Sequence, residues 1–441
     1  MKVNKWTAGL AAVGLVSLAS VAQAEEKVAN SVMTALSSTT ISGYVDTSMQ
    51  WNFGTGNANL PPYKFNSPSK ADGFNLDVVQ LRIDKPLDEQ DWSAGYRVDL
   101  WFGPDANTLG TQSPGSSASD FAIRQAYVLL RTPVGSGLDW KVGVFDSIIG
   151  YESVESGNDP NYTRSYGHSI EPQTETGILA IYHINNLIMV QGGIADAIGP
   201  QINYRAQQGG NGTTGGTLGG VWNAVYSAAG VSPAEFAGSN PKAESYKCYM
   251  GSIALTAPDS WGFLAKSTLY GGGVSGFNPS TLGSGAGGNQ SSWYVGSTIA
   301  TPLTDLRLGV AFDYLNAYRF NATSPGGSTI FGESNPWALG GYASYQCTEK
   351  LSFHGRLEYF NQGMNFNVNG VTPLSIGYPS TEKIFTTTLT AQYDLWKNVL
   401  SRVELRWDHA LNDEHIFGGT TAGAPNADNA WMLAANIIYK F

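Results

Sequence analysis

The sequence predicts a transmembrane antiparallel β-barrel, and three observations carry that prediction. Charged residues make up 14% of the chain and glycine 53 of its 441 residues, against roughly 25% and ~7% in soluble domains. Aromatic residues reach 12%, yet the mean hydropathy is only −0.16. Segments of about ten residues alternate between apolar and polar side chains, as strands do that cross a bilayer with one face in lipid and one in water.

The same composition excludes several other classes of protein. The body of the chain has no apolar run long enough for a spanning helix, and its aromatic content is too high for a disordered protein. The formal net charge of −10 disfavours nucleic acid as a partner. Two distant cysteines, Cys248 and Cys347, match neither a disulfide framework nor a zinc site by spacing. Without a C-x-x-C-H motif, no covalent c-type haem is expected, and we expect no cofactor.

The chain begins with the features of a secretory signal peptide. Lys2 and Lys5 precede an apolar stretch over 8–22, and Ala22-Gln23-Ala24 has the small-residue pattern of a cleavage site. We therefore expect a signal peptide over 1–24, a short periplasmic lead over 25–39 and the barrel over 40–441.

Alternation with a period of two supports about sixteen strands, or fourteen if the weak pair around 176–195 is lost. A soluble sandwich also alternates, but mid-strand charges on one face and aromatic residues near the ends of the other favour a barrel. The segment 121–131 is ambiguous, because Gln125 and Arg131 share a face with Ile123 and Tyr127. The segment 399–408 is clear: Val399, Val403, Leu405 and Trp407 alternate with Arg402, Glu404, Arg406 and Asp408.

The connections between these segments are alternately short and long, which predicts short periplasmic turns and long extracellular loops. An even number of strands also returns both chain ends to the periplasmic side. The expected long loops are rich in Gly, Ser and Asn and cover 54–72, 103–120, 150–173, 196–244, 271–291, 317–335, 361–382 and 410–429.

A barrel of this size has a lumen wide enough for water, so we expect its inward side chains to be polar. Acidic and basic residues two apart on a strand share a face. They form either a salt-bridged solvated wall or a charged pore lining that selects solutes. The pairs are Arg82/Asp84, Arg97/Asp99, Arg356/Glu358, Arg402/Glu404 and Arg406/Asp408.

The connection 150–173 differs from the others because it is poor in Gly and rich in charge and Tyr. It is either a polar surface loop or a loop folded into the lumen, where it would constrict the pore. In the second case its acids would face a basic wall, and the resulting transverse field would orient dipolar solutes. The candidate constriction residues are Glu152, Glu155, Asp159 and Arg164 on the loop and Arg82, Arg97, Arg124 and Lys141 on the wall.

Several short stretches resemble the OmpL-like family of outer-membrane β-barrel porins. They are Ile41–Ser48, Arg124–Val128, Lys141–Gly143, Gly150–Glu152, Asn161–Ser165 and Thr176–Gly177, and the resemblance is strongest between about 40 and 180. It implies a barrel in the outer membrane of a Gram-negative-type bacterium. The expected function is a passive, water-filled channel for small hydrophilic solutes. The aromatic last strand, ending in Phe441, resembles the strand that the barrel-assembly machinery reads, and porins of this size suggest a homotrimer.

Other classes of function remain as alternatives. The stronger one is a surface adhesin or receptor with a plugged lumen, for which the connection 196–244 offers Trp222, Tyr226 and Phe236. A sheath around a separate redox partner is another. An enzyme is disfavoured because Asp408 and His409 point to opposite faces of a strand and no G-x-S-x-G motif exists. Metal binding is disfavoured because an ordinary polar loop explains His409, Asp413 and His415.

Overall fold

The computed structural model describes residues 32–33, 38–54, 56–112, 119–203, 247–277, 289–323, 329–368, 383–411 and 415–441. Within them, sixteen antiparallel strands close into one barrel, as the sequence predicts. Neighbouring strands follow chain order, and the first and last strands pair to close the sheet. Closure leaves no unpaired edge, which is the requirement for a sheet in lipid.

The barrel strands are long enough to cross a bilayer. They are β2 (Thr40–Phe53), β3 (Gly73–Lys85), β4 (Ser93–Phe102), β5 (Phe121–Thr132), β6 (Leu138–Asp146), β7 (Thr174–Asn185), β8 (Ile188–Ala195), β9 (Cys248–Thr256), β10 (Thr268–Phe277), β11 (Asn289–Ala300), β12 (Leu306–Thr323), β14 (Trp337–Gln346), β15 (Leu351–Asn361), β17 (Lys383–Trp396), β18 (Val399–Ala410) and β19 (Asn429–Lys440).

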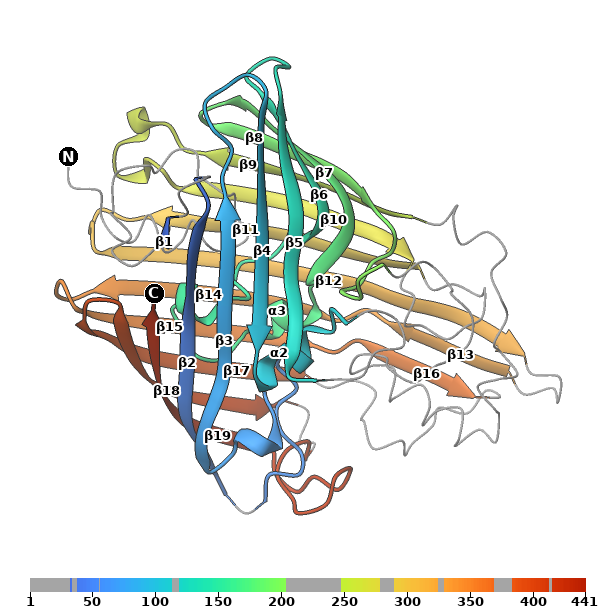
Figure 1. Cartoon of the computed structure of the whole chain (residues 1–441). Helices are drawn as coiled ribbons and strands as arrows, with labels where there is room; N and C mark the ends of the chain where they lie inside the picture. The colour runs from blue at the N-terminus through green and yellow to red at the C-terminus, as the bar shows by residue number, and fades with distance from the viewer. Residues whose placement is uncertain are drawn as a thin grey trace.

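Shorter elements are not part of this ring of strands. A two-residue strand, β1 (Val32–Met33), pairs with β2 within the expected periplasmic lead. The strands β13 (Thr329–Ser334) and β16 (Met364–Val368) pair with each other and extend the barrel wall at the long-loop end (Figure 1). The helical segments are η2 (Pro68–Lys70), α2 (Pro104–Leu109), η3 (Ser156–Asn158), α3 (Tyr166–Ile170) and η6 (Asp259–Leu264).

Alternating side chains give the wall its two faces, and β18 shows this most clearly. Val403 and Leu405 point outward and are 54% and 39% exposed, whereas Arg402, Glu404 and Arg406 point inward and are at most 2% exposed. Large apolar side chains on other strands are exposed in the same way, up to 84% for Phe74. The outer surface is therefore an apolar belt of the kind that lipid covers. None of the described helices has the length and apolarity needed to cross a membrane.

The strands reach further into three of the expected loops than the sequence predicts. β10 continues to Phe277 and β12 to Thr323, and β13 and β16 lie in the expected loops 317–335 and 361–382. Glycine-rich composition suggested a loop at 271–277, but this prediction is wrong. A Cβ on Gly272 would lie 2.9 Å from Cγ2 of Ile149. That glycine allows Ile149, in the connection between β6 and β7, to approach the strand closely and does not mark a turn.

The expected signal peptide, 1–24, lies outside the described residues, as do residues 25–31 of the expected lead. The aromatic residues Trp222, Tyr226 and Phe236 of the receptor alternative also lie outside them. These expectations remain predictions.

Candidate functional site

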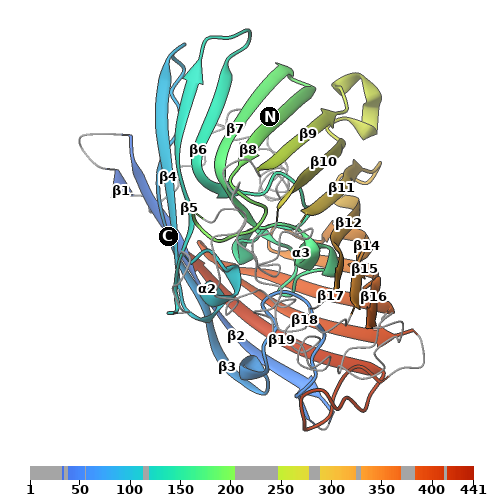
Figure 2. The same cartoon turned by 90° about the vertical axis from the view of Figure 1, so that its right-hand side faces the viewer.

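The chain segment between β6 and β7, residues 147–173, enters the barrel and carries α3 into its interior. Figure 2 shows α3 inside the ring of strands. The Ser147 N–H donates to the Gln173 carbonyl oxygen at 2.9 Å, so the two ends of the segment meet where it leaves the wall. We call residues 147–173 the inner loop. The sequence offered two positions for it, surface or lumen, and the structure has it in the lumen.

The first turn of the inner loop is apolar and packs on an apolar part of the wall. Ile148 and Ile149 are 3% and 4% exposed, and the ring of Tyr151 stacks on Tyr342 with centroids 4.1 Å apart. The inward residues below them are also apolar, which contradicts the expectation of a polar lumen at every strand. These inward residues are Leu179, Ile181, Met189, Met250 and Ala254 on β7, β8 and β9. The inner loop needs an apolar surface to pack on, and this part of the wall provides it.

The remainder of the inner loop is fixed to the opposite wall by charged residues. Arg356 on β15 donates to the Thr163 carbonyl oxygen at 2.9 Å and to Oε1 of Glu152 at 2.7 Å. Glu404 on β18 accepts from the backbone N–H groups of Tyr162 and Thr163 at 2.6 and 3.0 Å. Buried charges that are paired and hydrogen-bonded in this way hold a single arrangement, because losing one partner leaves an uncompensated charge.

Two further inward residues of β18 complete this attachment. Arg406 donates to the Arg164 carbonyl oxygen at 2.7 Å, and Asp408 accepts from the Tyr166 hydroxyl at 2.8 Å. Tyr166 also stacks on Phe360 with centroids 4.8 Å apart. The alternating charges of this strand are therefore covered by the inner loop and act as its anchors, a role that neither of the two interpretations from the sequence included.

The three predicted acids of the inner loop pair with different arginines. Glu155 forms ion pairs with Arg82 on β3 and Arg124 on β5, as the constriction hypothesis expects. Glu152 instead pairs with Arg356, across the lumen from the predicted wall. Asp159 pairs with Arg164 of the same loop, with Oδ2 3.0 Å from Nε. The path of the loop across the lumen explains the difference, because only its Glu155 region passes close to β3 and β5.

The predicted basic wall is largely neutralised by acids of the wall itself. Nε of Arg82 lies 2.7 Å from Oδ1 of Asp99, and Nη1 of Arg124 lies 2.9 Å from Oδ2 of the same carboxylate. Arg97 pairs with Asp84 at 2.7 Å. Among the described residues, Lys141 forms no ion pair; its ammonium lies 5.1 Å from the centroid of the Tyr127 ring.

A β-bulge resolves the phase ambiguity of β5. Asp99 is opposite Gln125 and Leu100 is opposite Ile123, so Arg124 is an extra residue in the register. Arg124 and Gln125 are consequently both buried on the lumen side, and both donate to Oδ2 of Asp99 at 2.9 Å. Bulges redirect side chains in this way, and here the effect is to add one more cation to the lumen wall.

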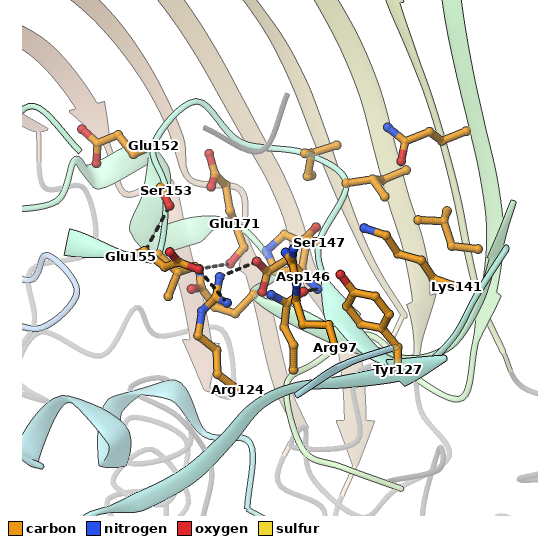
Figure 3. Close-up of a pocket in the computed structure, with 18 of the residues that line it drawn as sticks. Arg97, Arg124, Tyr127, Lys141, Asp146, Ser147, Glu152, Ser153, Glu155 and Glu171 are labelled. Carbon is orange, nitrogen blue, oxygen red and sulfur yellow. Dashed lines mark hydrogen bonds and ion pairs between the residues drawn. The ribbon is translucent and has the colours of Figure 1, made fainter. Parts of the chain in front are cut away.

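A cavity of about 200 Å³ lies between the inner loop and the wall formed by β3 to β8. It runs from Asp146, at the loop end of β6, to Lys141, near its other end (Figure 3). Seven of the eight candidate constriction residues are involved: Glu152, Glu155, Arg82, Arg97, Arg124 and Lys141 line it, and Arg164 supports the loop behind it by donating to the Val154 carbonyl oxygen at 2.9 Å. Asp159 lies within the loop, away from the cavity lining.

Burial and neighbouring charges raise the pKa of some side chains of the inner loop and lower the pKa of others. Burial raises the pKa of Asp159 to about 7, although Arg164 opposes the shift. Burial and the neighbouring Asp313 carboxyl raise the pKa of Glu171 well above its usual range. For Glu155, the cations Arg82 and Arg124 outweigh the effect of burial and lower the pKa. Burial, together with Arg164 and Lys64, lowers the pKa of His168 well below its usual range.

A second loop, described over 56–72, also contacts the site, although nothing in its sequence predicts these contacts. Tyr63 lies under the guanidinium of Arg406, whose Cζ is 3.7 Å from the ring centroid. The Lys64 N–H donates to Oγ of Ser169 at 2.8 Å. Lys70 forms ion pairs with Asp77 and Asp105 at 2.7 and 2.5 Å. An exposed-looking tyrosine beside a lysine in a loop carries no signal of this packing, because the contacts are made with strands far away in the sequence.

Asp408 and His409, which were considered for an enzyme, lie on opposite faces of β18. Asp408 points inward to Arg406, whereas the His409 ring stacks on Trp407 on the outer face, with centroids 5.5 Å apart. Asp413 lies outside the described residues. Nowhere in the described ranges do three or more His, Cys, Asp or Glu residues gather as metal ligands would.

Comparison with known proteins gives the family. The profile of the family described as "Putative beta-barrel porin-2, OmpL-like" matches residues 38–441. A comparison with curated proteins gave no match. The fold is similar to that of the outer-membrane channel DcaP of Acinetobacter baumannii, at 12% identity and a TM-score of 0.52 over 91% of this chain and 97% of that one.

OmpF of Salmonella typhi, in complex with daunomycin, shares the fold at 12% identity and a TM-score of 0.53, over 91% of this chain and 97% of its own. OprB of Pseudomonas putida does so at 12% identity and a TM-score of 0.50, over 91% and 94%. The chain therefore belongs to the OmpL-like β-barrel porin family and is a channel of the outer membrane.

Proposed function

We propose that this porin is a passive, water-filled diffusion channel for small hydrophilic solutes and that the inner loop forms its constriction. The single observation that carries the proposal is the cavity between the inner loop and the β3–β8 wall. The other side of the loop is fixed to β15 and β18 by buried hydrogen bonds, and to β17 by the Asn161 amide, which donates to Oγ1 of Thr390 at 2.7 Å. The solute path therefore runs along the cavity side. Passage needs neither an energy source nor a cofactor, and no catalytic step is part of it.

The constriction residues divide into two groups in this proposal. Glu155 and Glu152 contribute acids from the loop, and Lys141 and Arg97 contribute cations from the wall, with Arg97 26% exposed in its side chain. Arg82, Arg124 and Arg164 hold the acids in place. Asp159 supports the loop from within. A transverse electric field across the path then arises mainly from those charged groups that have no close partner of opposite charge. The fields of a closely paired acid and base largely cancel at points far from the pair.

Liposome swelling tests the channel, and planar-bilayer recording tests the alternative function. Purified protein should make liposomes swell in small sugars and amino acids, more slowly as the solute becomes larger. It should also give stepwise open currents in a planar bilayer. A surface receptor with a plugged lumen would give neither. Swelling no faster than that of protein-free liposomes would refute the diffusion channel.

The proposed partners of the barrel follow from its outer face and its last strand. The exposed apolar belt contacts outer-membrane lipid. Insertion by the barrel-assembly machinery and association as a homotrimer are supported by the aromatic C-terminal strand and by the family. Light scattering of the protein in detergent should give the mass of three copies after subtraction of the detergent. A mass of one copy would remove the homotrimer and leave the channel intact.

A further inference from the structure

The cavity beside the inner loop has two chemically different walls. One is apolar and is formed by Leu179, Ile181 and Met189, which are at most 7% exposed. The other carries the ammonium of Lys141 next to the ring of Tyr127. A pore that passes only hydrophilic solutes needs polar inward residues, so packed apolar side chains along this cavity require a separate explanation.

Part of this apolar wall supports the inner loop, but part of it faces the cavity. Ile148 and Ile149 of the loop belong to one packed apolar cluster with Met250 and Ala254 of the wall. Leu179, Ile181 and Met189 also belong to this cluster, yet they line the cavity together with Gln191. Met250 and Ala254 of β9 do not line the cavity, so the β9 side of the cluster is covered, whereas its β7–β8 side faces the cavity.

Lys141 is the cation best placed to receive a ligand. It is directly opposite Leu179 in the β6–β7 register, so the charge and the apolar wall are immediate neighbours. The other cations of the cavity are engaged: Arg82 and Arg124 by Asp99 and Glu155, and Arg97 by Asp84. Asp146, at the other end of the same strand, is paired with Arg124. Figure 3 shows Lys141 and Tyr127 side by side on the cavity wall, apart from the group of acids around Glu155.

We propose that this part of the cavity is a binding subsite for a small amphipathic organic anion, a carboxylate attached to an apolar body. The carboxylate contacts Lys141 and the apolar body lies on Leu179, Ile181 and Met189. The inference rests on the proposed channel function, since the subsite lies on the solute path. Its volume is sufficient, because a cavity of about 150 Å³ in another protein holds benzene. A few placed polar groups on a mostly apolar surface are also typical of small-molecule sites.

Three probes separate the two halves of the subsite without any substitution. Benzoate carries both the carboxylate and the ring, benzyl alcohol carries the ring alone, and acetate carries the carboxylate alone. In a planar bilayer with the wild-type porin, benzoate should interrupt the open current at about tenfold lower concentration than either of the other two, equivalent to about 1.4 kcal/mol. Equal interruption by benzoate and benzyl alcohol, or by benzoate and acetate, would overturn the subsite.

Substitutions then test which residues bind the carboxylate and which bind the apolar body of the ligand. Lys141→Gln should raise the benzoate concentration needed about tenfold and leave benzyl alcohol unchanged. Met189→Gln should weaken benzoate and benzyl alcohol and leave acetate unchanged. Lys397→Gln removes the same charge from an exposed residue of the β17–β18 turn and should behave as wild type. An equal effect of Lys141→Gln and Lys397→Gln would mean that only the overall charge matters, and the subsite would be lost.

The failure of the subsite and the failure of the channel have different signatures. Open current steps with no preference for benzoate would refute the subsite and leave the channel. A protein without open steps would refute the channel. In that case, titration calorimetry of benzoate into the detergent-solubilised porin, wild type against Lys141→Gln, would still decide the subsite. Heat of binding lost in the variant supports it, and heat that is equal in both or absent in both refutes it.

Discussion

At the scale of single residues, Glu155 is the inner-loop acid that meets the predicted basic wall. It lines the cavity and compensates Arg82 and Arg124 together. The pairing of Glu155 with these two arginines could be predicted from the sequence, because both arginines lie on strands close to the strand from which the loop departs. The pairing of Glu152 with Arg356 could not be predicted, since the two are 204 residues apart and the path of the loop across the lumen is a tertiary property.

Replacing Glu155 by Gln should make the channel more anion-selective. The two arginines keep Asp99 and Asp146 as partners, but the site gains one unit of positive charge. A unit charge about 8 Å from the path is worth about 0.5 kcal/mol in water, and salt reduces this, so the permeability ratio of anions to cations should rise about twofold. Reversal potentials in a salt gradient measure it. Asp305→Asn, in an exposed turn, is the control, and an equal shift in both variants would refute a local effect.

The buried Asp159 should make the packing of the inner loop depend on pH. Burial raises its pKa from 3.8 to about 7. A carboxyl that resists ionisation in the folded loop favours that loop below about pH 4, and the contribution is lost as the pH rises through about 7. Hydrogen exchange of the 150–170 peptides, corrected for intrinsic rates, should show less protection at about pH 8 than at about pH 5.

Asp159→Asn provides the control for this pH dependence. The amide does not ionise, so protection in the variant should be the same at both pH values. A pH dependence that persists unchanged in Asp159→Asn would assign the effect to another group, such as Glu171.

At the scale of elements, strands were predictable and their irregularities were not. Alternation in β18 determines both of its faces, because every second residue from Arg402 to Asp408 is charged. In β5 a bulge changes the phase at Arg124, and a strict period of two predicts the wrong face for half of the strand. In β10 the glycines predict a loop, but Gly272 is required there because Ile149 packs close to the strand. A strand that needs glycine for close packing has the same composition as a flexible loop. Local sequence does not distinguish these cases, since contacts from other elements decide them.

Removing the main anchor of the inner loop should widen the channel. Arg356→Ala leaves Glu152 buried without its partner, and breaking a buried pair in this way costs about 3–5 kcal/mol. The loop should leave its wall, and the single-channel conductance and the open-state noise should both increase. Limited proteolysis should cut within 150–170 in the variant and spare this segment in the wild type.

Arg131→Ala is the matched control for the anchor. Arg131 pairs with Asp139 on the barrel wall away from the inner loop, and both side chains are partly exposed, at 26% and 17%. An exposed pair is worth about 0–1 kcal/mol, so conductance and proteolysis should stay as in the wild type. Equal conductance in Arg356→Ala and Arg131→Ala would contradict the role of Arg356 as an anchor.

At the scale of the whole molecule, closure of the sheet was the most predictable feature. Long apolar-out strands have to pair at both edges in lipid, so an even, closed set of strands follows from the alternation and from the connection lengths. The lumen was less predictable. Its contents depend on how two loops, 54–72 and 147–173, pack against one another, and no periodicity encodes that arrangement. The sequence therefore predicted the wall and the candidate loop but gave only part of the pairing inside.

The closing seam of the barrel leads to a last prediction about Phe441. Its N–H donates to the Gly43 carbonyl oxygen at 3.0 Å, and its own carbonyl oxygen accepts from the Gly43 N–H at 3.0 Å. Phe441→Ala keeps these backbone bonds and removes only the ring.

If the assembly machinery reads the terminal aromatic residue, Phe441→Ala should lower the amount of folded protein in the outer membrane several-fold. Refolding into lipid vesicles should proceed as in the wild type. Phe441→Tyr keeps an aromatic ring and should be normal in both assays. Heat-dependent migration on gels measures the folded fraction in each. Equal loss in cells and in vesicles would assign the ring to the stability of the seam instead, and no loss in cells would mean that the terminal aromatic residue is not read.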